Sequence, residues 1–213
     1  MRRLFFLPRA EAGFTVVELV VSMAIMGLMV GSLLVSGVAT RREFALNKNT
    51  EELRALFVQA KFLAISTVGD PDLGTTPGAS APICGYGVHL DFKKSEAFIF
   101  RSVSARPSGE DPCPLDAGYL YPFTKGRDLR LVGPPYTLRL ARTVAFGEEE
   151  KKRGTFDALF IPPDPVAFLS FGGSGTFVEE AVLALRAADG GGEARSIRLN
   201  RFGLVALEPF SSR

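Results

Sequence analysis

Apolar residues follow two different patterns along the chain, and the first is a continuous run. Residues 14–39 are 26 residues with a single charged side chain, that of Glu18. At about 1.5 Å of rise per residue, a helix of this length crosses a hydrocarbon core of about 30 Å. The run therefore predicts a transmembrane helix, in which Glu18 needs an explanation.

A periodic pattern follows and continues the same helix. In "EELRALFVQAKFLAIST" the apolar positions recur at three- and four-residue spacing, which is typical of one face of an amphipathic helix. They are Leu53, Leu56, Phe57, Ala60, Leu63 and Ala64. Gly69 and Pro71 then supply stop signals. The pattern predicts one long helix over residues 14–68, whose first half (14–39) lies in a membrane or filament core and whose second half packs on a globular domain.

After residue 70 the apolar period changes to two, which indicates strands. "YGVHLDF" and "AFIFRSV" flank the turn "KKSE" and predict a hairpin. Further strands are predicted at 129–132, 137–146, 167–171, 181–186, 196–199 and 204–207, and "GEEEKKRG" is interpreted as a solvated turn whose charges compensate. Together these elements predict an α+β protein, in which the long N-terminal helix packs on an antiparallel β-sheet domain over residues 69–213.

Positive charge is concentrated before the apolar run. The chain has 213 residues and a formal net charge of +2, and Arg2, Arg3 and Arg9 against Glu11 account for this excess. The positive-inside rule then predicts a cytoplasmic N-terminus and a globular domain outside the inner membrane. The near-neutral remainder argues against bulk nucleic-acid binding.

Small residues precede the apolar run, where a secretory signal would carry them after it. Ala10, Ala12 and Gly13 come directly before Phe14, so a cut after Gly13 leaves the helix on the mature chain. A plain uncleaved anchor is the alternative, and it gives no reason for Glu18.

The stretch "GFTVVEL" behind a short basic leader resembles the class III signal of type IV pilins and pseudopilins. The resemblance implies that residues 1–13 are a cleaved leader, that prepilin peptidase cuts after Gly13, and that the new amino group of Phe14 is methylated. It also implies as partners other pilins, bound through the helix, an inner-membrane assembly platform and membrane lipid. No cofactor is implied.

Glu18 is the fifth residue of such a mature chain. A carboxylate in hydrocarbon costs roughly 2.5–3.5 kcal/mol and needs a partner. In the pilin family the acid is thought to neutralise the N-terminal amine of a neighbouring subunit, which implies an assembly role for Glu18 here. A headgroup-level glutamate without a partner is the alternative.

The C-terminal half is similar to the H-type pseudopilin branch, which includes the GspH/FimT-like minor pilins. The similarity rests on "YGVHLDF", "VAFLSFGGSGTF" and "IRLNRFGLVAL". These are strand and turn patterns, and they are less specific than the N-terminal motif.

The two cysteines, Cys84 and Cys113, flank the predicted hairpin. In an exported chain they predict one disulfide at its base, and two free thiols are the alternative. On the chain-entropy model such a loop contributes roughly 3–4 kcal/mol.

No catalytic or metal site is predicted from the sequence. His89 is the only histidine, which excludes a two-histidine metal site, and a strand histidine beside Asp91 is interpreted as a solvated residue. "FGGSGTF" lacks the lysine and the following helix of a phosphate-binding loop. The sequence therefore does not predict an enzyme.

One binding hypothesis remains. Four cations, Arg127, Arg130, Arg139 and Arg142, lie among apolar residues around Tyr136 and would contact DNA phosphates if their strands share a face. Ordinary polar alternation on a sheet is the favoured alternative. The leading expectation is thus a minor pilin or pseudopilin that initiates, caps or primes a type IV pilus or a type II secretion pseudopilus. A filament-tip pilin that binds DNA or a surface is the alternative.

Overall fold

The computed structural model describes residues 15–66, 83–103, 123–125, 128–162, 166–173, 176–189 and 194–209, with the backbone alone at 33–39 and 209. The chain divides into two compact units, with the boundary between Arg41 and Arg42. The helices are α1 (Val16–Ser66) and α2 (Glu148–Arg153). The strands are β1 (Ile83–Asp91), β2 (Glu96–Val103), β3 (Leu129–Arg130), β4 (Thr137–Arg139), β5 (Val144–Phe146), β6 (Thr155–Ile161), β7 (Val166–Phe171), β8 (Phe177–Val178), β9 (Glu180–Ala187), β10 (Ala194–Asn200) and β11 (Val205–Pro209).

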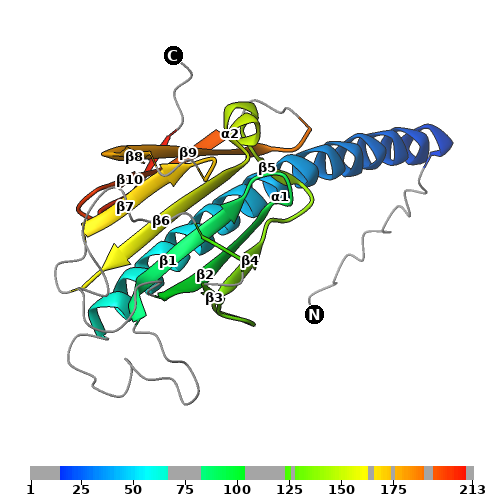
Figure 1. Cartoon of the computed structure of the whole chain (residues 1–213). Helices are drawn as coiled ribbons and strands as arrows, with labels where there is room; N and C mark the ends of the chain where they lie inside the picture. Colours follow the sequence, from blue (N-terminus) through cyan, green and yellow to red (C-terminus); the bar gives the residue numbers. More distant parts are fainter. Residues whose placement is uncertain are drawn as a thin grey trace, which may run out of the picture. The chain divides into compact units, whose positions relative to one another are not determined.

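The strands form two antiparallel sheets (Figure 1). The larger one has seven strands in the order β3-β2-β1-β6-β7-β8, with β4 also pairing with β2. The smaller one has four strands in the order β11-β10-β9-β5. The α+β class with a long N-terminal helix and an antiparallel domain is therefore confirmed.

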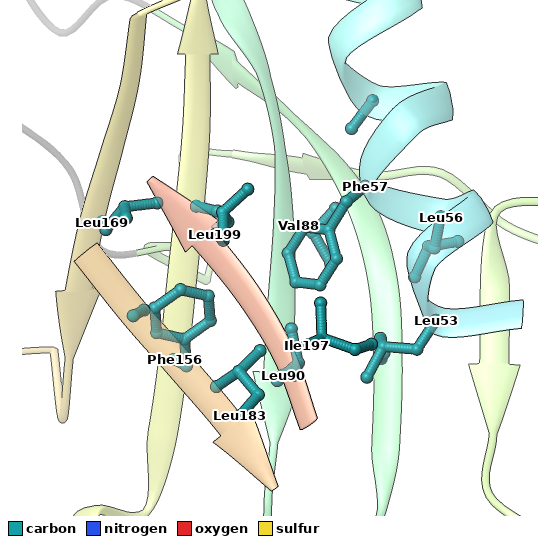
Figure 2. Close-up of a cluster of buried hydrophobic side chains, with 14 of the residues drawn as sticks. Leu53, Leu56, Phe57, Val88, Leu90, Phe156, Leu169, Leu183, Ile197 and Leu199 are labelled. Carbon is teal, nitrogen blue, oxygen red and sulfur yellow. The ribbon is translucent and has the colours of Figure 1, made fainter. Parts of the chain in front are cut away.

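The main hydrophobic core lies on one face of the larger sheet. The second half of α1 and the smaller sheet both pack against this face, so that Phe57, Val88 and Ile197 meet in one cluster (Figure 2). The ring of Phe57 is fully buried and lies edge-on to Phe156 of β6, with 6.4 Å between ring centroids. The periodic apolar stripe of the helix is thus the surface that covers the sheet.

A smaller cluster occupies the opposite face of the same sheet. Its buried members are Phe98, Phe100, Leu159 and Ile161. Because β6 buries side chains on both faces, "TFDALFI" lacks a period-two pattern. The pattern of apolar residues therefore did not predict this central strand.

The predicted strand at 137–146 is wrong as a single element. The chain leaves the larger sheet after β4, which pairs with β2, and enters the smaller sheet at β5, which pairs with β9. Between them the backbone N–H of Ala141 donates to Oδ1 of the buried Asn49 on α1, at 3.0 Å. A hydrogen bond to α1 therefore fixes the backbone at Ala141, where the chain passes from the larger to the smaller sheet.

The predicted turn "GEEEKKRG" is a helix instead. Three acidic residues in the first turn of α2 and three basic residues in its last turn match the helix dipole. Gly154, at φ 83°, ends the helix. Four of the charges do compensate at the surface, because Glu148 pairs with Lys151 and Glu149 pairs with Lys152, each at 2.7 Å. Glu150 turns inward and accepts the backbone N–H of Ala184 in β9 at 3.0 Å.

Glu150 thereby completes the edge of the smaller sheet where β5 ends, and its replacement tests this role. Glu150→Ala leaves the N–H of Ala184 buried without an acceptor, which should lower the free energy of unfolding by about 1–3 kcal/mol. Glu150→Gln keeps an acceptor oxygen and should lose less. Denaturant unfolding measures both, with Glu149→Ala as the exposed control, which should stay within about 0.5 kcal/mol of the wild type. Equal stability of Glu150→Ala and Glu149→Ala would contradict this role.

Candidate functional site

The first turn of α1 holds the acid singled out by the sequence. Oγ1 of Thr15 accepts the backbone N–H of Glu18 at 3.2 Å, and the hydroxyl of Ser22 donates to the carbonyl of Glu18 at 2.8 Å. Thr15 is therefore the N-cap, and Glu18 is the third helical residue. This T-x-x-E spacing is that of a capping box, a local signal by which the sequence marks the start of the helix.

This position changes the electrostatics expected for Glu18. A carboxylate in the first turn is stabilised by the positive end of the helix dipole, typically by about 0.3–1 kcal/mol. That is smaller than the roughly 2.5–3.5 kcal/mol cost of a charge deep in hydrocarbon. The helix terminus therefore offsets only part of the cost, and a partner cation is still required if the turn enters an apolar phase.

Apolar side chains cover the rest of this helical segment and are exposed within the chain. They are Val16, Val17, Leu19, Val20, Val21, Met23, Ile25, Met26, Leu28, Met29 and Val30. A Cβ added at Gly27 or at Gly31 would meet no atom within 4 Å. A contiguous exposed apolar surface of this kind marks an interaction site.

The sequence predicts a membrane span at residues 14–39, and side chains are described for residues 15–32 of this segment. Across the residues that the structure covers, no helix combines the length and the apolar character needed to cross a membrane.

Several sequence-derived residues lie outside the described part of the chain. They are Gly13 and Phe14 of the processing site, Cys113 and Arg127. Cys84 is described at the second position of β1, where its side chain is buried. The Cys84–Cys113 disulfide stays a prediction.

Two of the four arginines share a face of the larger sheet. Arg130 of β3 pairs in register with Phe100, and Arg139 of β4 pairs with Glu96. Because Glu96 and Phe100 are four residues apart on β2, their partners point to the same side. Arg130 forms an ion pair with Glu96, and its guanidinium lies 4.1 Å from the ring centroid of Phe98. Arg142 is exposed in the turn after β4.

His89 is not the solvated residue that the sequence predicted. Its Nδ1 lies 2.7 Å from Oδ1 of Asp157 in β6, and the side chain of Asp157 is 2% exposed. The rings of Phe98 and Phe123 flank the imidazole, each with a centroid distance of 5.0 Å. The partner lies 68 residues away in sequence, so no local signal identifies it.

Asp91, the sequence neighbour, has a separate role in the hairpin turn. Its Oδ1 accepts the backbone N–H groups of Lys93 and Lys94, and its Oδ2 lies 2.7 Å from Nζ of Lys94. Burial raises the pKa of Asp91, but the side-chain and backbone hydrogen bonds of Lys94 outweigh it, so the pKa lies below its ordinary value.

A polar row crosses the second face of the larger sheet beside His89. The register places Asp157 between His89 on β1 and Ser170 on β7. Oδ2 of Asp157 and Oγ of Ser170 are buried without a hydrogen-bond partner in the described structure. Because the carboxylate separates the hydroxyl from the imidazole, the row lacks the nucleophile-to-base contact of a hydrolase. Within the described ranges, no group of three or more His, Cys, Asp or Glu side chains could hold a metal ion.

Comparison with known proteins concerns the N-terminal segment. Residues 8–34 match the family model of the prokaryotic N-terminal methylation motif. No curated protein and no solved structure matches the chain. The matched residues include the predicted cut site, Thr15, Glu18 and the exposed apolar segment of α1. The match supports the similarity of this N-terminal segment to those of type IV pilins and pseudopilins.

Proposed function

We propose that the chain is a minor pilin or pseudopilin, a non-enzymatic subunit that initiates, caps or primes a type IV pilus or a type II secretion pseudopilus. The observation that carries the proposal is the methylation motif at residues 8–34. The first turn of α1 supports it, because a capped helix start presents Glu18 at the head of an exposed apolar helix. The assignment to the H-type branch rests on the strand and turn patterns of the C-terminal half alone.

In this proposal, cleavage after Gly13 creates the amino group that Glu18 needs. Prepilin peptidase cuts the leader, and methylation of Phe14 keeps the positive charge. The amine of one subunit then pairs with Glu18 of its neighbour, in an apolar surrounding formed by the helices of both. Before assembly, the same helix anchors the chain in the inner membrane with a cytoplasmic N-terminus.

Removal of the cut site should leave the leader on the protein. Gly13→Val should yield a precursor heavier than the mature chain by about 1.5 kDa, the mass of thirteen leader residues. Intact-mass measurement on the membrane fraction detects this difference. Gly27→Ala is the matched control, because a Cβ at this position meets no atom within 4 Å and should not affect processing. Normal cleavage of Gly13→Val would contradict the proposed site.

Substitutions of Glu18 separate its charge from its place in the capping box. Glu18→Gln keeps a capping-box side chain but cannot neutralise an amine, whereas Glu18→Asp keeps the charge. If the charge pair drives assembly, Gln and Ala should both lower incorporation into filaments by roughly tenfold or more, the effect of about 1.4 kcal/mol. Asp should retain more. Incorporation is measured as the fraction of processed protein in sheared filaments. If Glu18→Gln were incorporated as well as the wild-type protein, the charge pair would be refuted.

A filament-tip pilin that binds DNA is the second candidate. Its supporting observation is that Arg130 and Arg139 share a face of the larger sheet. The ion pair of Arg130 with Glu96 weighs against it. An arginine whose charge is already neutralised by a carboxylate releases few counterions when it contacts a DNA phosphate, and therefore adds little to the affinity. We expect no salt-dependent binding of the full-length protein to duplex DNA. Affinity that falls with salt in the wild type, but less steeply in an Arg130→Ala/Arg139→Ala double variant, would favour this candidate instead.

A further inference from the structure

The two edges of the smaller sheet differ in how their backbone groups are satisfied. At the β5 edge, Glu150 accepts the N–H of Ala184, and the N–H of Gly147 donates to the carbonyl of Ala184 at 3.0 Å. The opposite edge is β11, which pairs only with β10 among the described strands. An open strand edge of this kind is a template for pairing with another chain.

Two hydrogen bonds define which groups of β11 point outward. The N–H of Asn200 donates to the carbonyl of Leu204 at 3.2 Å, and the N–H of Arg201 donates to the carbonyl of Glu179 at 2.9 Å. In an antiparallel ladder the hydrogen-bonded pairs alternate along the strands. Leu204, Ala206 and Glu208 therefore direct their backbone groups toward β10. Val205 and Leu207 direct theirs away from it.

The surface beside this edge has room for side chains. A pocket of about 310 Å³ lies between α1 and the β10–β11 pair, where Asn47, Thr50 and Glu51 form the helical wall and Leu207 part of the opposite wall. Leu207 is 38% exposed, although its register partner, Ile197, is fully buried. Paired residues point to one side of a sheet, so a strand added to β11 would place a side chain beside Leu207 in this pocket.

We propose that β11 pairs antiparallel with β11 of a second copy of this chain, about a two-fold axis at Ala206. In this register Val205 of each copy lies opposite Leu207 of the other. Each such pair exchanges two N–H to carbonyl bonds, so all four outward N–H groups find acceptors. The inference rests on the globular unit alone and does not depend on the proposed function.

The register at Ala206 is favoured over its neighbour. An axis at Leu207 would place Pro209 opposite Val205, and proline has no N–H to donate. With the axis at Ala206, Glu208 lies opposite Leu204 of the second copy, so no like charges meet across the interface. The exposed side chain of Leu204 is then partly covered.

Cysteine cross-linking of the full-length protein in detergent tests this register. Residues of a non-hydrogen-bonded antiparallel pair lie about 4.5 Å apart at Cα, within the range of a disulfide. Ala206→Cys should therefore give a disulfide-linked dimer under mild oxidation. Glu208→Cys is the matched control on the same strand and face, and its two copies would be too far apart to link.

The expected result is roughly tenfold more reducible dimer for Ala206→Cys than for Glu208→Cys or the wild type, because only the first pair falls within disulfide range. Equal cross-linking of the two variants, or none above the wild type, would overturn the proposal. Leader cleavage, measured on the same samples, should be normal in each variant. Failure of the β11 contact is thus distinguishable from failure of the proposed pilin function.

Discussion

The domain depends on the burial of one helix face against one sheet face. The buried apolar residues of α1 in the core cluster, from Leu46 to Ala64, are at most 3% exposed, and they pack against the larger sheet and the inner side of the smaller one. Burying side chains of this size contributes about 1.5–3 kcal/mol each, and truncating a buried phenylalanine such as Phe57 typically costs about 3–5 kcal/mol. Both sheets share this single core, so the helix stabilises them as one unit.

Buried polar side chains accept hydrogen bonds from backbone N–H groups that the apolar core cannot satisfy. Asn49, Asp128 and Glu150 each accept a backbone N–H at a place where a strand ends or the chain changes sheet. Such groups are costly to bury without partners. The partners of Asn49 and Glu150 come from segments 92 and 34 residues away in the sequence. Asp157 and Ser170 differ, because each keeps a buried side-chain atom without a partner in the described structure. Among the described strands, the outer edge of β11 is likewise unpaired.

The functional segment differs in kind from this domain. The start of α1 has few contacts of its own beyond the Thr15 cap, and its apolar side chains are exposed. Stability there must come from a surrounding that the single chain does not supply. The pilin-like role proposed above would account for this difference, because the exposed helix and the charge of Glu18 would both acquire partners on assembly. In that role the β-rich unit would supply the surfaces by which one subunit differs from another.

The sequence by itself determined the local features of this protein. These are the methylation motif with Glu18, the periodic stripe of the helix, the β1–β2 hairpin and the α+β class, because each depends on residues close together in the chain. The tertiary structure decided the rest. It alone revealed β6 as a strand buried on both faces, the break between β4 and β5, the inward turn of Glu150, and the pairing of His89 with Asp157. Each of these depends on contacts between segments tens of residues apart. A local sequence pattern does not show which distant group will pack against a side chain or form a hydrogen bond with a buried polar atom.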